Sequence, residues 1–150
     1  MHSVAEIFSN NALLCAFVAW AAAQAIKGLT AGIRFHDWSV KAFFDSGGMP
    51  SSHTSAVVAL AMRIGFSEGF STPLFAVSGV FAMVVMYDAA GVRREAGKQG
   101  KIIKELLSIN RPDGKPLLSE DLKERIGHTP LEVIMGALLG LFFALLFSLL

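Results

Sequence analysis

Four apolar segments constrain the fold of this chain more than any other feature of its sequence. They cover residues 12–26, 56–64, 73–87 and 131–150. Only the last reaches the roughly 20 residues that cross the hydrocarbon core of a bilayer unaided, so the others need polar flanks or a tilt to span it. Charged residues make up 17% of the chain, whereas soluble domains carry about 25%. The chain is therefore expected to be an integral membrane protein.

The fold class follows from the same segments. No strand pattern, repeat or linker interrupts the sequence, and 150 residues are enough for one domain. We expect a single membrane-embedded domain over residues 1–150. It should be all-α, a compact integral-membrane bundle of about four transmembrane or membrane-embedded helices.

Small residues indicate where these helices pack closely. Gly136 and Gly140 form a Gly-x-x-x-Gly pattern in the last apolar segment, which lets a neighbouring backbone approach. The neighbour is either another helix of the same chain or a second copy in a homo-oligomer, and the sequence leaves both interpretations open.

The basic residues are distributed unevenly between the connecting segments. If all four segments cross the membrane, every Lys and Arg except Arg63 lies on one side, which the positive-inside rule assigns to the cytoplasm. The chain is then a multi-pass protein of the cytoplasmic (inner) membrane with both termini facing outward. The region around residues 101–109 alternates apolar and charged residues at helical spacing, which predicts a short amphipathic helix at the headgroup level.

The stretch Gly47-Gly48-Met49-Pro50-Ser51-Ser52-His53-Thr54 combines a turn, a helix start and a titratable side chain. Paired glycines permit unusual φ angles, and proline followed by two serines predicts a helix start whose first N–H groups lack partners. Such a terminus attracts anions, and His53 could exchange a proton with a phosphate bound there. A capped helix with an interfacial histidine is the structural alternative.

A second polar stretch precedes the last apolar segment. Thr129-Pro130-Leu131-Glu132 has the pattern of a capping box with proline at the first helical position. Glu132 would then cap the backbone of Thr129. It also lies four positions after His128, so it could instead hold one imidazole nitrogen and leave the other as a nucleophile or base.

Cations and one carboxylate accompany these two stretches. Arg93 and Arg94 are either a charge anchor at the headgroups or forked donors to phosphate oxygens, with Asp88 near enough in sequence to hold one of them. Lys27 and Arg34 have the same two interpretations. We expect no metal site, because the chain has one cysteine and only His128 and Glu132 at a helical metal-ligand spacing.

Together these motifs resemble a known superfamily. Lys27-x6-Arg34, Pro50-Ser51-Ser52-His53, an arginine and His128-x3-Glu132 are similar to the three signature motifs of the type-2 phosphatidic acid phosphatases and vanadium haloperoxidases. More closely, the chain resembles the small divergent bacterial and plastid branch of that superfamily. It departs from the usual pattern with Phe35 in place of proline and Ser52 in place of glycine, and its arginine is not at the usual distance before His128.

The resemblance implies metal-independent hydrolysis of a phosphate ester through a phosphohistidine, without a cofactor. His128 would be the nucleophile, with Glu132 in the place of the superfamily's supporting aspartate, and His53 the general acid. The implied phosphate-binding groups are Lys27, Arg34, Arg93 or Arg94, Ser51, Ser52 and Gly48, with Asp88 in support.

The sequence therefore leads us to expect a membrane lipid phosphatase whose active site faces the cytoplasm. Its substrate would be a phosphomonoester or diphosphate headgroup, such as phosphatidylglycerol phosphate, phosphatidic acid or a polyprenyl phosphate. The bilayer is its expected environment, and no nucleic-acid partner is expected. The alternative is a non-catalytic membrane protein that binds anionic lipid or a partner through its basic face.

Overall fold

The secondary structure of the chain is helical, as the sequence predicts. A computed structural model describes residues 4–36, 38–39, 48–109 and 128–150. Within these residues there is no strand, and the elements are, in order, a 3-10 helix η1 (Val4–Ser9), α1 (Asn11–Phe35), α3 (Ser52–Glu68), α4 (Pro73–Ala90), α5 (Val92–Ile109) and α6 (Pro130–Ser148). The predicted all-α class is confirmed.

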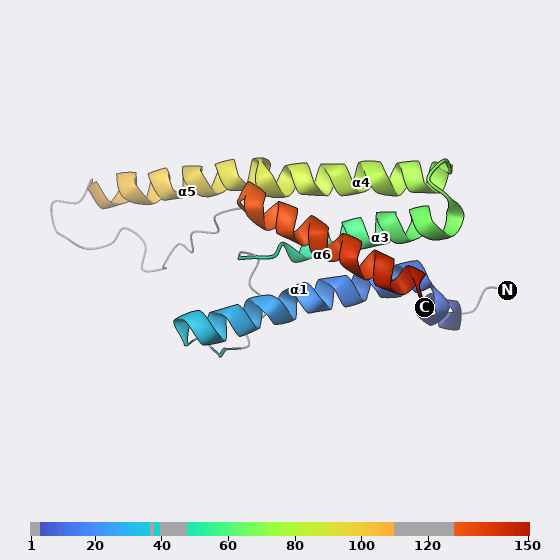
Figure 1. Cartoon of the computed structure of the whole chain (residues 1–150). Coiled ribbons are helices and arrows are strands. Elements are labelled where there is room, and N and C mark those ends of the chain that lie inside the picture. The colour runs from blue at the N-terminus through green and yellow to red at the C-terminus, as the bar shows by residue number, and fades with distance from the viewer. Residues whose placement is uncertain (1–3, 37, 40–47, 110–127) are drawn as a thin grey trace.

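Helix α3 is the centre of the bundle. It packs against α1, α4 and α6, and these four helices alternate in direction (Figure 1). The alternation places η1 and the end of α6 at one end of the bundle. The starts of α3 and α6, the last part of α1 and the junction of α4 with α5 lie at the other end (Figure 1). The segments predicted to carry the site therefore share one end.

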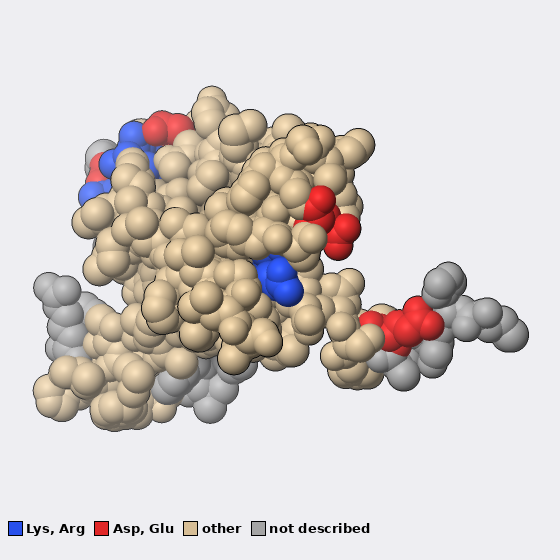
Figure 2. Space-filling view, turned by 45° about the vertical axis from the view of Figure 1, so that its right-hand side comes forward, with Lys and Arg blue, Asp and Glu red and all other residues tan. Residues whose placement is uncertain are grey.

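The interior is built from small side chains. Cys15, Ala19, Ala59 and Ala144 are fully buried and form the core cluster. Large apolar side chains point outward instead, as Phe17 at 61% and Val77 at 68% exposure illustrate. Figure 2 shows one face on which Lys, Arg, Asp and Glu occupy only small patches of an otherwise continuous surface. Close packing through small residues beneath an apolar exterior is the arrangement of a helix bundle in lipid.

Three helical stretches of the described chain are long and apolar enough to cross a membrane: Asn11–Ile33, Pro73–Glu105 and Pro130–Ser148. Helix α3 is not among them. It has 17 residues, which at about 1.5 Å per residue is slightly short of the hydrocarbon thickness of about 30 Å. Helices α1, α4 and α6 surround α3. Of the four predicted transmembrane or membrane-embedded helices, α3 is therefore the one that we interpret as embedded between the others.

Two helices differ in extent from the apolar segments that predicted them. Helix α1 runs on to Phe35, well beyond residue 26, because Lys27 is buried inside the bundle instead of ending the helix at its surface. The predicted amphipathic helix is the second half of α5, and α5 continues close to the direction of α4 (Figure 1). Its location at the headgroup level stays a prediction.

Candidate active site

The start of α3 is fixed by its own residues. Gly48 has a φ of 87°, a left-handed conformation that favours glycine. Ser51 is the N-cap, and its Oγ accepts hydrogen bonds from the backbone N of Thr54 at 3.5 Å and from the Thr54 hydroxyl at 3.0 Å. The predicted helix start is therefore confirmed. Gly48 has the unusual φ expected of the glycine pair, whereas Gly47 lies outside the described residues. Thr54 is not among the predicted site residues. Its spacing of three residues from the capping serine is nevertheless a pattern that can be recognised in the sequence.

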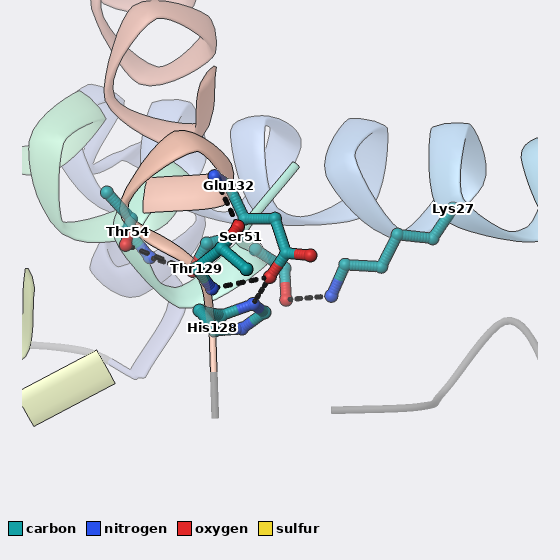
Figure 3. A network of polar contacts seen from close by, with 7 residues as sticks. Lys27, Ser51, Thr54, His128, Thr129 and Glu132 are labelled. Atoms are coloured by element: carbon teal, nitrogen blue, oxygen red, sulfur yellow. Dashed lines mark hydrogen bonds and ion pairs between the residues drawn. The ribbon is translucent and has the colours of Figure 1, made fainter. Parts of the chain in front are cut away.

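The start of α6 shows both predicted roles of Glu132 at once. The capping box is complete: Thr129 Oγ1 accepts from the Glu132 N–H at 3.3 Å, and Glu132 Oε2 accepts from the Thr129 N–H at 3.0 Å. The same Oε2 lies 2.9 Å from Nδ1 of His128 (Figure 3). The two interpretations left open by the sequence are therefore compatible.

The two helix starts are joined directly. The Ser51 N–H donates to the carbonyl oxygen of Glu132 at 3.0 Å, so this donor is used between helices and is not directed at a ligand. That differs from the prediction that Ser51 binds phosphate through its backbone. The fully buried Ser51 side chain caps Thr54, and Ser51 connects the two halves of the site.

Helices α3 and α6 also approach closely beyond their starts. A Cβ at Gly136 would come within 2.5 Å of the Ser51 carbonyl oxygen, and one at Gly140 within 2.5 Å of the Ser55 carbonyl oxygen. The Gly-x-x-x-Gly pattern therefore serves packing within the chain, and a homo-oligomer stays a prediction. Helix α3 is also joined to α1, because the Ser55 hydroxyl donates to the Ala19 carbonyl at 3.2 Å. No local sequence signal singles out Ser55.

Helix α1 contributes a buried cation to this end of the bundle. Lys27 is 5% exposed, and its Nζ lies 3.3 Å from Oγ of Ser52, which is 1% exposed. Figure 3 shows the Lys27 side chain extending from α1 toward the starts of α3 and α6. An ammonium group is costly to bury without polar partners, and the Ser52 hydroxyl is one such partner. Lys27 therefore lies at the same end of the bundle as the histidine–carboxylate pair, as the motifs predict (Figure 3).

The other predicted residues lie around this network. His53 is on the exposed side of the first turn of α3, and Gly48 precedes that helix and is exposed. Asp88 and Arg94 are partly buried near the α4–α5 junction, at the same end of the bundle. The side chains of Arg34 and Arg93 lie outside the described part of the structure.

The histidine–carboxylate pair defines what this site can do chemically. A neutral imidazole that donates its Nδ1 hydrogen to Glu132 presents a lone pair on Nε2. The carboxylate would also stabilise positive charge on the ring after Nε2 forms a bond. Among the described residues, no group of three or more His, Cys, Asp or Glu side chains is arranged to hold a metal ion.

Comparisons with known proteins agree with this picture of the chain. A family described as "Divergent PAP2 family" matches residues 8–143. The chain is 39% identical over 155 aligned positions to "Uncharacterized membrane protein YuiD" of Bacillus subtilis (strain 168), covering 95% of this chain and 97% of that protein. No solved structure matches the chain.

Proposed function

The chain belongs to the divergent PAP2 family, and on this premise we propose that it is a metal-independent membrane lipid phosphatase acting through a phosphohistidine. The observation that carries the proposal is the 2.9 Å contact between His128 Nδ1 and Glu132 Oε2, beside the buried Lys27 and the helix start that bears His53. The substrate class is a lipid with a phosphomonoester or diphosphate headgroup, such as phosphatidylglycerol phosphate, phosphatidic acid or a polyprenyl phosphate.

In the first step, His128 Nε2 attacks phosphorus. The P–N bond forms as the bond to the leaving oxygen breaks, and His53 donates a proton to that oxygen. Glu132 stabilises the positive charge that develops on the His128 ring. In the second step, His53 takes a proton from water, the resulting hydroxide attacks phosphorus, and the P–N bond breaks to release inorganic phosphate.

The cations stabilise the charge on the phosphoryl oxygens during both steps. Lys27, held by Ser52, is the buried member of this set. Arg94, the neighbouring Arg93, and Arg34 are proposed to complete it, with Asp88 orienting one guanidinium. The first-turn N–H groups of α3 at Ser52 and His53, together with the Gly48 turn, add donors near the helix start.

The experiment is phosphate release from a panel of lipid phosphates by purified protein in detergent with a chelator present. We expect His128→Ala to abolish turnover and His53→Ala to lower it by about 10²- to 10⁴-fold, the usual contribution of one general acid. His36→Ala is the matched control, because His36 is an exposed C-cap of α1. It should release phosphate at the wild-type rate.

Equal release by all the variants would contradict the proposal. No release by the wild type from any substrate would favour the alternative, a non-catalytic protein that binds anionic lipid or a partner through its basic face. A requirement for added divalent metal would rule out the metal-independent mechanism. A phosphoryl label on wild-type protein that is lost in acid, kept in alkali and absent from His128→Ala would support the covalent intermediate.

A further inference from the structure

A groove runs along the outside of the bundle from the candidate site. It has a volume of about 720 Å³, within the range of about 300–1,000 Å³ typical of ligand pockets. Its polar end is formed by the turn before α3 and the start of α6, including Gly48, Thr129 and Glu132. Glu132 also contacts the His128 ring, so this end of the groove is continuous with the site.

The rest of the groove is apolar. Its walls come from α1 and α6, and the residues that form them include Ile26, Met135, Leu138, Leu139 and Phe142. Several of these are open to the outside of the bundle, since Leu138 is 55% exposed and Phe142 57% exposed. In a membrane-spanning bundle the outside at this depth is lipid, so the groove opens sideways into the bilayer.

The length of the groove matches one leaflet. From Glu132 to Phe142 helix α6 rises by about 15 Å, at about 1.5 Å per residue. That is half of the roughly 30 Å hydrocarbon core. A hydrocarbon chain that starts at the polar end of the groove therefore reaches the middle of the bilayer where the groove ends.

We propose that this groove holds a hydrocarbon chain of the lipid phosphate while its headgroup occupies the site at His128. The inference rests on the proposed function and specifies how the substrate is recognised: one polar headgroup at Glu132 and one chain lying between α1 and α6. A lipid phosphate is a better occupant than a partner helix, because the polar end of the groove adjoins the site where a headgroup would bind. The groove selects a lipid that belongs to the leaflet on the site side of the bundle.

The test compares two substrates and two variants. Leu138→Trp places a large ring at the middle of the groove, whereas Ile134→Trp places the same ring on α6 at a position that does not line it. Ile134 and Leu138 are both 55% exposed, so they are matched in exposure and helix. The substrates are a long-chain lipid phosphate and a water-soluble aryl phosphate that lacks a chain.

We expect Leu138→Trp to lower kcat/KM on the long-chain substrate by about tenfold or more, because losing the burial of a few methylene groups is enough for that change. Its hydrolysis of the aryl phosphate should stay at the wild-type rate, which also shows that the variant is folded. Ile134→Trp should leave both activities unchanged. Equal losses in the two variants on the long-chain substrate would overturn the groove assignment.

A binding measurement separates this inference from the proposed function. A lipid phosphate with a photoreactive group in its chain should label residues of the groove, and the corresponding lipid alcohol without phosphate should not. The label should decrease in Leu138→Trp and persist in Ile134→Trp. If the wild type hydrolyses neither substrate, the proposed function fails, but the labelling still shows whether the groove binds the hydrocarbon chain of a lipid phosphate. If it hydrolyses the aryl phosphate but both lipids label all outward positions alike, the groove inference fails and the function stands.

Discussion

The Oε2 atom of Glu132 accepts hydrogen bonds from two groups with different purposes. The bond to the Thr129 N–H stabilises the start of α6, and the bond to His128 Nδ1 sets the orientation of the ring. Glutamine can complete a capping box as well as glutamate can. Only a carboxylate, however, is certain to accept the ring hydrogen and to stabilise positive charge on the ring. The two roles can therefore be separated by substitution.

We predict that Glu132→Gln keeps the stability of the protein and lowers its activity. The thermal unfolding temperature in detergent should stay close to that of the wild type, because the amide oxygen still caps Thr129. The rate of phosphate release should fall by about tenfold or more, since a charge-assisted hydrogen bond is lost. The amide NH₂ can also donate to Nδ1, which would leave Nε2 protonated and unable to attack phosphorus.

Thr129→Ala is the complementary control. Its hydroxyl caps the Glu132 N–H, and loss of an N-cap usually costs about 0.5–2 kcal/mol of stability. This variant should unfold at a lower temperature and keep most of its activity. If Glu132→Gln instead unfolds early and turns over normally, the carboxylate serves the helix start alone.

Lys27 is expected to contribute to phosphate binding. We predict that Lys27→Met weakens inhibition by inorganic phosphate by about tenfold or more, because a charged donor to the anion is removed. Thermal unfolding checks that the variant is folded, since methionine fills a similar space. The measurements are the phosphate inhibition constant and thermal unfolding in detergent. Lys98→Met, at an exposed lysine on α5, is the control and should change neither quantity. Unaltered phosphate inhibition in Lys27→Met would mean that Lys27 has a structural role and does not bind phosphate.

At the scale of the helices, the site depends on the close approach of α3 and α6. We predict that Gly136→Ala destabilises the protein by about 1–3 kcal/mol, the usual cost of overpacking. Its Cβ would lie 2.5 Å from the Ser51 carbonyl oxygen, a backbone atom that cannot move without shifting α3. Phosphate release should fall too, because the shift moves the start of α3 away from His128. Unfolding temperature and phosphate release in detergent measure both effects.

Gly79→Ala is the matched control for this prediction. Gly79 lies in α4 with no atom near the position of an added Cβ, so alanine there should be neutral or slightly stabilising. Equal unfolding temperatures for Gly136→Ala and Gly79→Ala would mean that the close α3–α6 contact is not needed for stability.

The helix starts could be predicted from sequence because their signals are local. Ser51 and Thr129 cap helices through residues three positions away, a distance that a sequence motif contains. The end of α1 could not be predicted in this way, because burial of Lys27 against Ser52 of α3 lets the helix continue past the apolar segment. Gly136 and Gly140 indicated a close approach, yet their partners Ser51 and Ser55 are on a different helix.

The groove could not be predicted from the sequence for a related reason. Helix α6 is apolar around its whole circumference, so its pattern does not indicate which side faces α1 and which faces lipid. The resemblance to the superfamily assigns His128, Glu132 and Lys27 to one site on sequence motifs alone. It does not indicate that the Ser51 N–H is used to join α3 to α6.

At the scale of the whole molecule, alternating helices separate two ends with different chemistry. The site end carries Lys27, Arg94 and the basic residues of α5, whereas the connection between α3 and α4 lies at the opposite end, with η1 and the end of α6 (Figure 1). From the positive-inside rule we predict that the bundle inserts with its basic end toward the cytoplasm. Lipid phosphates of the inner leaflet would then reach the site without crossing the membrane.

Cysteine labelling tests this orientation. In a Cys15→Ala background, which removes the native thiol, Lys98→Cys places a thiol on α5 and Ser71→Cys places one between α3 and α4, and both positions are exposed. We predict that a membrane-impermeant maleimide labels Ser71→Cys in intact cells and labels Lys98→Cys only after the membrane is opened. The physical reason is the cost of moving the basic residues of α5 across the bilayer. The reverse pattern would place the site on the outer surface, and the substrate would then have to come from the outer leaflet.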